Sequence, residues 1–536
     1  MSDNHSDESP SLFRSMMLEK LDESTAQVTE QQAREGDAPV GFITSPTSTR
    51  KCEFAVFESM TELVYEGQLL VVKQNGEKII GLVTNLFESS RGSSTGVMNY
   101  FSVLYGSLPT LEQSLRYGEM QIYGNPTFPG TKRIFTPPTP YSPIYVSIKE
   151  DYEAIFKDPA RHSDYYTIGT IRGTNYPVDL DAAAILRMGV GIFARIGMGK
   201  SITAGINLLG LGSLSKKVNV IVWDHTGEYS TSNLSETLGN RFDTMSTREL
   251  PMIPANSTDI IKSLGFDVLP TQARKAVEIA AEIFMLDFIE GRVSMNIPAF
   301  MDYVIPWLDE FYKRGNSISS WTKAICRRLE ALGSDLFNGG TINSYKEVWK
   351  KVKNKILVID ASHEPLEARQ SKLGTIASHI LHHRYPIQLI VDEAKNYVPE
   401  TGGSFYNTIV GKPFLSSGKL INLSEEGRKF GSNLTIINQR VSRISKAVFS
   451  NLNTLFCGCL TAASDIKAIE NYTDFPEIKG ILPRLGIGEF LVAGMATPLK
   501  EPLVVEIDKG ELELGFGGKS VFELHKNIGT LTREKK

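Results

Sequence analysis

Short apolar runs of two kinds divide the chain into regions. From Val40 to about Ile168, β-like runs such as GFIT and QLLVVKQ follow one another closely, separated by Gly, Asn, Pro and Ser. Closely spaced short strands predict a small barrel or sandwich. The segment QNGEK at 74–78 predicts a hairpin turn. The pattern therefore indicates a small N-terminal β-domain, either a barrel or a sandwich, which we place at residues 38–168.

A different rhythm begins near Thr170. Short and almost wholly apolar runs recur there, at 190–194, 218–224, 355–360, 387–393, 434–439 and 454–460. Such runs are typical of strands buried on both faces of a parallel sheet, and helical stretches between them predict α/β crossover units. A helical insert lies between the second and third runs, with amphipathic spacing at 271–291, 299–315 and 320–333. The predicted fold class is α/β.

The patterns also predict how the chain divides. A polar, acidic arm at 1–37 is expected to be disordered apart from one helical stretch at 12–21. The remaining parts are the β-barrel at 38–168, the first part of the α/β core at 169–265, the helical insert at 266–350, the second part of the core at 351–510 and a C-terminal tail at 511–536.

Charge is distributed unevenly along the chain. The total is 57 Lys and Arg against 61 Asp and Glu, a net charge of −4. The arm at 1–37 carries nine acidic and three basic residues, so the rest of the chain carries +2. Residues 410–446 hold seven basic and two acidic residues. Whole-chain charge is therefore a poor guide to the partner, and a nucleic-acid partner is not excluded.

Composition excludes several classes of protein. No apolar stretch reaches the roughly 18 residues that a membrane helix needs, and the acidic N-terminus is not a signal peptide. Four cysteines, Cys52, Cys326, Cys457 and Cys459, are too few for a disulfide scaffold, and their spacing fits no zinc site. We expect Cys457 and Cys459 to be core residues. No membrane association and a reducing, cytoplasmic location are the default expectation.

The segment ARIGMGKS at 194–201 has the context of a phosphate-binding loop. It follows an apolar strand and opens a helix that we expect to run from Lys200 to Leu209 and to end at Gly210. Backbone N–H groups of such a loop bind phosphate oxygens, Lys200 would reach the β- and γ-phosphates, and the Ser201 hydroxyl would bind Mg²⁺. Ala194 replaces the first glycine of the usual pattern, so a plain strand–turn–helix corner remains the alternative.

A strand that ends in two carboxylates supports the phosphate-loop interpretation. The segment LIVDE ends in Asp392 and Glu393, about 190 residues after the loop. In a nucleotide site the first carboxylate holds the Mg²⁺ shell and the second polarises a water for attack on the γ-phosphate. The alternative is a pair of solvated carboxylates. The combination with the loop favours a nucleoside triphosphate hydrolase over a small-molecule kinase.

Two further polar positions are weaker candidates. Gln439 ends the run 434–439, where an amide could bond the attacking water or the γ-phosphate. Arg428 lies in the segment EEGRKFG at 425–431, and arginines in oligomeric NTPases often stabilise γ-phosphate charge across a subunit boundary. On their own, a surface glutamine and an exposed helix C-terminus with a glycine cap are the better interpretations.

Four segments resemble the HerA–FtsK superfamily of P-loop ATPases, and the HerA family most closely. These are ARIGMGKS, VIVWDHTGEYS at 220–230, LIVDEAKNYVP at 389–399 and EGRKFGSNLTIINQRVSRISKAVFSNLNT at 426–454. The N-terminal β-region resembles the HerA–ATP-synthase barrel. The resemblance spans about residues 38–510, and it implies a RecA-like P-loop NTPase core with a parallel sheet and a helical insert.

The resemblance also implies roles for individual residues. Asp392 with Ser201 would bind Mg²⁺, Glu393 would activate water, Gln439 would sense the nucleotide, and Arg428 would act in trans. The implied ATP-binding residues are Ala194, Gly197, Met198, Gly199, Lys200, Ser201 and Ile202. Arg187 matches a second family arginine within one residue. Two departures from the family pattern are Ala194 and Ile196, and the segment 402–419 is longer than usual.

The function implied is an ATP-hydrolysing homohexamer that translocates double-stranded DNA in its central channel. A NurA-like nuclease would dock on the barrel, and the pair would resect DNA ends in repair. Lys412 and Lys419 are candidates for DNA-facing positions. The alternatives are a HerA-type ATPase of a defence complex, a conjugation or packaging motor, and an ATP-binding ring that only gates an effector enzyme.

Overall fold

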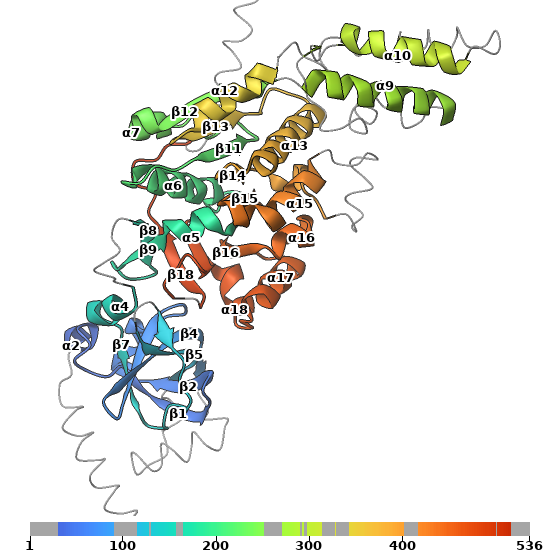
Figure 1. Cartoon of the computed structure of the whole chain (residues 1–536). Coiled ribbons are helices and arrows are strands. Elements are labelled where there is room, and N and C mark those ends of the chain that lie inside the picture. The colour runs from blue at the N-terminus through green and yellow to red at the C-terminus, as the bar shows by residue number, and fades with distance from the viewer. Residues whose placement is uncertain are drawn as a thin grey trace, which may run out of the picture.

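The structure is a computed structural model of the chain. It describes residues 30–89, 115–127, 130–156, 164–250, 271–289, 292–293, 297–312, 327, 342–400, 416–499 and 501–515. The barrel lies at one end of the molecule, the α/β core in the middle, and the helical insert at the far end from the barrel (Figure 1). Most of the predicted acidic arm, the position Lys412 and most of the predicted C-terminal tail lie outside the described residues.

The N-terminal β-region is a closed barrel. Its strands run in the order β2-β1-β7-β3-β4-β5, and an antiparallel pairing of β5 with β2 closes the circle. The strands are β1 (Gly41–Thr47), β2 (Lys51–Val56), β3 (Leu69–Gln74), β4 (Glu77–Ser89), β5 (Leu115–Pro126) and β7 (Pro143–Val146), with the short β6 (Thr131–Lys132) paired to β5. The predicted hairpin turn is confirmed, because Asn75 and Gly76 both have positive φ between β3 and β4.

The core is built on one large sheet. Within the described residues its order is β12-β13-β11-β14-β15-β10-β16-β17-β18-β8-β9; the strands from β12 to β16 are parallel, and those from β17 to β9 are antiparallel. Their bounds are β8 (Tyr165–Ile171), β9 (Pro177–Asp181), β10 (Gly189–Phe193), β11 (Val220–Asp224), β12 (Phe242–Ser246), β13 (Ile356–Asp360), β14 (Gln388–Val391), β15 (Asn433–Asn438), β16 (Leu452–Cys457), β17 (Glu489–Gly494) and β18 (Leu503–Ile507).

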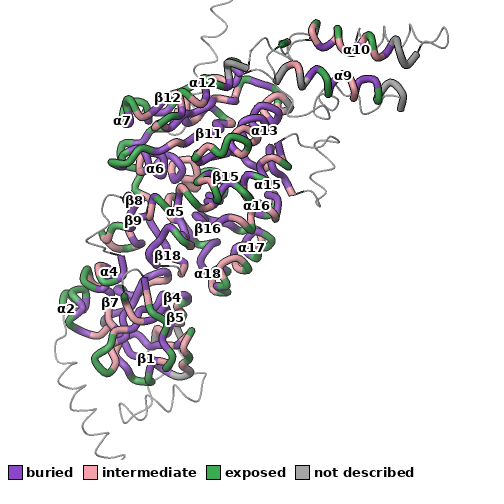
Figure 2. Tube along the Cα trace, viewed as in Figure 1, coloured by how far each residue is buried: buried purple, intermediate pink, exposed green. Residues whose placement is uncertain are grey.

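Burial explains why these runs form the central strands. Every residue of β10, β11, β14 and β15 is buried, and helices cover the sheet on both sides (Figures 1 and 2). A strand covered on both faces reads as a continuous apolar run, because neither face meets water. The predicted α/β fold class is therefore confirmed.

Helices connect the strands and cover the sheet. They are α2 (Glu30–Arg34), α4 (Lys149–Phe156), α5 (Ala182–Arg187), α6 (Lys200–Ser213), α7 (Leu234–Leu238), α9 (Thr271–Ile289), α10 (Ile297–Tyr312), α12 (Ile342–Val352), α13 (Leu366–His383), α15 (Ser417–Glu426), α16 (Lys446–Phe449), α17 (Ala463–Thr473) and α18 (Ile478–Ile481). In the insert, α9 and α10 pack against each other through Phe284 and Phe300. The helix predicted at 320–333 lies outside the described residues apart from residue 327.

The prediction that Gly210 ends the helix after the phosphate loop is wrong. α6 continues to Ser213. A Cβ at position 210 would lie 2.0 Å from the ring of Tyr166, so the glycine makes room for an aromatic side chain of β8. A helix tolerates an interior glycine at a cost of about 1 kcal/mol, which this close packing offsets.

Ion pairs and hydrogen bonds join the barrel to the antiparallel part of the core sheet. Arg484 pairs with Glu66, and Arg172 both pairs with Glu489 at 3.0 Å and donates to the carbonyl of Glu66. The Tyr123 hydroxyl donates to the carbonyl of Pro502. The barrel is therefore anchored on the antiparallel part of the core sheet.

Three expected absences concern only the described part of the chain. No helix there is long and apolar enough to cross a membrane. Cys52, Cys457 and Cys459 are buried free thiols, which confirms that the last two are core residues, and Cys326 lies outside the described residues. Among the described residues, no group of three or more His, Cys, Asp and Glu side chains is arranged to hold a metal ion.

Candidate active site

The carboxyl ends of four parallel strands meet at one pocket. β14, β15 and β10 are neighbours, and β11 borders β14, so the segments that follow these strands share one edge of the sheet. A cavity of about 1020 Å³ opens there. Ligands of open α/β sheets bind at this edge, because side chains and helix N-termini converge on it. We call this cavity the nucleotide pocket.

The phosphate loop forms one wall of this pocket. Gly197 and Gly199 have φ values of 80° and 93°, which side chains with a Cβ rarely adopt, and Gly199 caps the N-terminus of α6. The N–H of Arg195 donates to the carbonyl of Cys459 at 3.2 Å, and the N–H of Gly488 donates to that of Met198 at 3.2 Å. The end of β16 and the turn before β17 thus hold the loop in place.

Ala194 is accommodated by a glycine on the neighbouring strand end. Ala194 is fully buried. A Cβ added to Gly458 would lie only 2.8 Å from the Ala194 Cβ. Real Cβ atoms do not approach so closely, so the extra methyl group at position 194 is matched by the missing one at 458. The departure from the usual loop sequence is therefore absorbed by packing, and the loop N–H groups are unaffected.

The Glu393 carboxylate is the most tightly held charge in the pocket. One oxygen accepts from Lys200 Nζ at 3.1 Å and from Gln439 Nε2 at 3.0 Å, and the other lies 2.6 Å from Lys395 Nζ. Burial favours the neutral acid, but the charges of Lys200 and Lys395 outweigh it and hold the Glu393 pKa at about 2. Its φ of 47° is a left-handed conformation that a residue other than glycine adopts only under constraint.

Asp392 is a buried carboxylate suited to a cation. It is 3 % exposed, and burial raises its pKa to about 7, with Glu393 and Asp224 adding to the rise and Lys200 opposing it. The buried Tyr229 ring lies close enough for Asp392 to raise its hydroxyl pKa further. An anionic oxygen kept from water is the donor that Mg²⁺ prefers. The residues here therefore fit a hydrated Mg²⁺ ion.

A loop after β11 closes the pocket beside Asp392. The Asp224 carboxylate is completely buried and accepts from the N–H groups of Gly227, Tyr229 and Ser230 at 2.9–3.0 Å. One side chain thus organises the turn in the segment DHTGEYS, which places Thr226 and Glu228 in the pocket wall.

The predicted site residues do not all lie in this pocket. Gly197, Gly199, Lys200, Ser201, Ile202, Asp392, Glu393 and Gln439 line it. Ala194 and Met198 do not line it and support the loop from behind, whereas their neighbours Arg195 and Ile196 do line it. Arg428, in the 3₁₀ helix η8 (Gly427–Phe430), and Arg187, at the end of α5, are exposed and lie outside the lining of their own chain's pocket. Lys419 is half-buried near the start of α15.

Sequence reasoning missed two groups of residues. Lys395 stands in the quoted segment LIVDEAKNYVP, and a lysine two positions after Glu393 was a readable signal for its ion pair. Residues Lys509–Gly515 line the pocket from the far side although they follow the last strand by only a few positions. No local pattern marks that second group.

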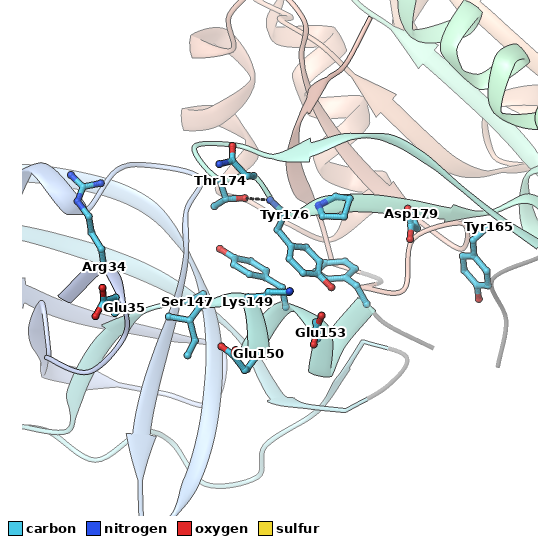
Figure 3. A pocket seen from close by; sticks show the side chains of 15 residues that line it. Arg34, Glu35, Ser147, Lys149, Glu150, Glu153, Tyr165, Thr174, Tyr176 and Asp179 are labelled. Carbon is cyan, nitrogen blue, oxygen red and sulfur yellow. Dashed lines mark hydrogen bonds between the residues drawn. The ribbon is translucent and has the colours of Figure 1, made fainter. Parts of the chain in front are cut away.

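A second cavity, of about 850 Å³, lies where the barrel meets the core (Figure 3). α2 and the region around α4 line one side, and the β8–β9 hairpin lines the other. Tyr152 of α4 stacks on Tyr176 of the hairpin with ring centroids 4.9 Å apart. We call this cavity the junction pocket; it contains none of the predicted site residues.

Comparisons with known proteins identify the family. The family described as "Helicase HerA, central domain" matches residues 166–383, which include the phosphate loop. Residues 166–383 therefore belong to the HerA-type helicase family, and the chain resembles HerA-type proteins along most of its length. It is 26 % identical to a probable helicase of Methanocaldococcus jannaschii over 72 % of this chain and 74 % of the relative.

Relatives named HerA match over long stretches as well. The chain is 22 % identical to the DNA double-strand break repair helicase HerA of Saccharolobus solfataricus, over 70 % of this chain and 74 % of that one. It is 21 % identical to the DNA double-strand break repair helicase HerA of Sulfurisphaera tokodaii, over 90 % of this chain and 96 % of that one. Among solved structures, VirB4 of Thermoanaerobacter pseudethanolicus aligns with a TM-score of 0.46 and 17 % identity, covering 69 % of this chain and 99 % of that one.

The residues matched by the family include the phosphate loop, which lines the nucleotide pocket, whereas Asp392, Glu393 and Gln439 follow the matched range.

Proposed function

We propose that this HerA-type ATPase is a homohexameric motor that translocates double-stranded DNA. The observation that carries the proposal is that Lys200 and Gln439 both donate to Glu393 in the pocket that contains the phosphate loop. Relatives that match most of this chain are named DNA double-strand break repair helicases. Motors need hydrolysis that is coupled to contacts elsewhere, and this site has the parts for hydrolysis.

Hydrolysis requires Lys200 to change partners. When a γ-phosphate enters, it competes for the ammonium group that now donates to Glu393. The released carboxylate oxygen, still next to the Gln439 amide, can then orient a water for attack. Asp392 and Ser201 are the residues that would hold Mg²⁺, which supplies neutralising charge to the phosphates.

An arginine from a neighbouring subunit would complete the site. Arg428 is exposed and does not line the pocket of its own chain, as a residue acting across a subunit boundary should be. Arg187, also exposed, is a second candidate. A guanidinium at the γ-phosphate stabilises the charge of the transition state and is worth a factor of about 10³ or more in rate.

DNA would be held by its phosphates. The half-buried Lys419 and the position Lys412, which lies outside the described residues, are candidates for contacts in the channel. Phosphate contacts release counterions, so binding should be independent of sequence and should weaken steeply with salt. A nuclease of the NurA type is the proposed partner on the barrel, with DNA end resection as the joint reaction.

The proposal is tested by translocation and by mixing subunits. Displacement of a third strand from a triplex at the end of duplex DNA should require ATP and the wild-type site. Lys200→Ala and Arg428→Ala chains should each be inactive alone and should recover activity when mixed, because a mixed ring contains interfaces with one intact Lys200 and one intact Arg428. Particle mass should correspond to six chains.

Two results would point elsewhere. ATP binding without turnover on any DNA would favour a ring that only gates an effector enzyme. ATP turnover by a monomer that Arg428→Ala leaves unchanged would contradict both the proposed role of Arg428 across a subunit boundary and the proposed hexamer.

A further inference from the structure

The segment 509–515 is built into the nucleotide pocket by one asparagine. The Asn233 side chain donates to the carbonyl of Glu511 at 2.7 Å and accepts from the N–H of Glu513 at 2.9 Å, while its own N–H donates to the carbonyl of Glu513 at 3.1 Å. These bonds join positions about 280 residues apart in the chain. Asn233 therefore holds the segment at three points.

Two glycines allow the segment to lie directly on the core. A Cβ at Gly205, in α6, would lie 2.6 Å from Leu512. A Cβ at Gly515 would lie 1.7 Å from the Thr231 hydroxyl, and the N–H of Gly515 donates to the carbonyl of Glu228 at 3.2 Å. The segment therefore packs against α6 about one turn beyond Ser201, and against the loop after β11.

This position fixes which end of a nucleotide the segment meets. Lys200 and Glu393 mark the γ-phosphate end of the pocket, and α6 leads away from it through Ser201 and Ile202. The α-phosphate, ribose and base of a bound nucleotide must extend in that direction, since the phosphates occupy the loop. Leu512, packed on Gly205, stands on this path.

The chemistry around the segment suits a sugar and a base. Glu513 belongs to the segment, the carbonyl of Glu228 accepts from the N–H of Gly515, and Glu236 follows Asn233 by three positions, so three carboxylates and one base, Lys509, lie at the segment. Carboxylates accept hydrogen bonds from ribose hydroxyls. Leu512 and Leu514 of the segment add apolar side chains to this part of the lining.

We propose that the segment 509–515 is the ribose and base subsite of the nucleotide pocket, and that Asn233 is the residue that positions it. The subsite would take a nucleoside, with acidic side chains at the sugar and apolar ones at the base. The proposal deepens nucleotide binding by this ATPase and is independent of DNA translocation, so it is tested without DNA.

The test compares two ligands that differ only at the far end. Pyrophosphate occupies the phosphate loop alone, whereas ADP adds the ribose and the base. Calorimetric titration of the full chain with each ligand and Mg²⁺ should show that Asn233→Ala weakens ADP about tenfold or more, because two hydrogen bonds that order the segment are lost. The affinity for pyrophosphate should be unchanged. Leu512→Ala should likewise weaken the binding of ADP and leave the affinity for pyrophosphate unchanged.

Asn219→Ala is a matched control. Its side chain also donates one hydrogen bond, to the carbonyl of Pro386, and accepts one, from the N–H of Asn354, but it precedes β11 and so lies at the opposite edge of the sheet. Asn219→Ala should leave both affinities at the wild-type value. Asn233→Asp keeps the acceptor for Glu513 and loses the donor, so its ADP affinity should fall between those of the wild type and Asn233→Ala.

Equal weakening of ADP and pyrophosphate by Asn233→Ala would overturn the proposal, because it would show a general loss of pocket structure. Unchanged ADP affinity in both Asn233→Ala and Leu512→Ala would overturn it too. Neither result bears on whether the protein moves DNA.

Discussion

The nucleotide pocket and the junction pocket are similar in volume, but only the nucleotide pocket contains buried charges and a strained backbone, which destabilise a fold. The first, about 1020 Å³, buries the charges of Lys200, Asp392 and Glu393 and holds Glu393 in a left-handed conformation. The second, about 850 Å³, is lined by stacked aromatic rings (Figure 3). None of its acidic and basic residues is buried: Glu150 and Lys149 are among the exposed ones, and Glu153 and Asp179 are partly exposed.

This difference shows which features indicate chemistry. Buried charge and backbone strain each destabilise a fold by a few kcal/mol, so they persist only where the surroundings compensate them. A cavity between two packed units arises without any such cost. Buried charge and backbone strain, rather than volume, therefore make the nucleotide pocket the candidate site of reaction.

The largest contrast between the pockets should come from Lys200→Ala. This variant removes the ammonium group that we propose to bind the phosphates, so ATP turnover should fall by about 10²-fold or more. Lys216→Ala is the control, because it also breaks a lysine ion pair, with Asp164, but on an exposed surface beyond α6. Its turnover should match the wild type. Comparable losses in both variants, measured by phosphate release, would break the comparison.

A smaller effect should follow from filling the space beside Ala194. Gly458→Ala places two methyl groups about 2.8 Å apart and also crowds Phe490, so the phosphate loop should shift and ADP affinity should fall about tenfold. Adding Ala194→Gly to the same chain should restore part of the loss. Gly418→Ala, where a new Cβ meets no atom within 4 Å, should change nothing. Calorimetric titration of the four chains measures this, and no recovery in the double variant would contradict the pairing.

The buried carboxylate should make stability depend on pH. The pKa of Asp392 is about 7 in the folded chain and near 3.8 in an exposed one, so the folded state binds more protons between these values. The stability of the ligand-free protein should therefore fall as the pH rises from about 4 to 7. At pH 8 the free energy of unfolding of Asp392→Asn should exceed that of the wild type by on the order of 1–4 kcal/mol, and this difference should vanish at pH 3.5.

Thermal unfolding in the presence of a chelator measures that difference. A gain that is equal at both pH values would show that Asp392 is not the source. Glu393 acts in the opposite direction, because its pKa of about 2 lies below the usual 4.5. Its contribution is present above about pH 4.5 and is lost as the pH falls toward 2.

The smallest effect on catalysis should come from the junction pocket. Tyr176→Ala removes a ring that stacks on Tyr152 and lies 6.0 Å from Phe156, so the free energy of unfolding should fall by about 1–3 kcal/mol. ATP turnover at a temperature where the variant is folded should equal that of the wild type. A turnover change larger than the Gly458→Ala effect would mean that the junction pocket also serves the reaction.

The sequence predicted those parts of the fold that depend on local pattern. Apolar runs such as 220–224 are readable because a strand buried on both faces must be apolar throughout. The spacing around Lys200 and the carboxylates after β14 likewise indicated the phosphate end of the pocket. The HerA resemblance added the barrel and the roles of Gln439 and Arg428, and those roles remain predictions.

What the sequence did not predict depends on contacts between distant positions. Gly210 reads as a helix end, and only the Tyr166 ring beside it explains why α6 continues. The far wall of the pocket relies on Asn233, which bonds residues about 280 positions later. Ala194 looks like a defect until Gly458 is seen opposite it. Pairings of this kind leave no periodic signal along the chain.

The central claim is that Glu393 activates water in a DNA-coupled ATPase, and one measurement addresses it most directly. ATP turnover is measured for the wild type and for Glu393→Gln, each with and without linear duplex DNA. The account predicts that duplex DNA stimulates the wild type severalfold, and that Glu393→Gln binds ATP but turns over at least about 10²-fold more slowly in both conditions. Wild-type ATP turnover that is the same with and without duplex DNA, or a Glu393→Gln chain that hydrolyses ATP at the wild-type rate, would contradict it.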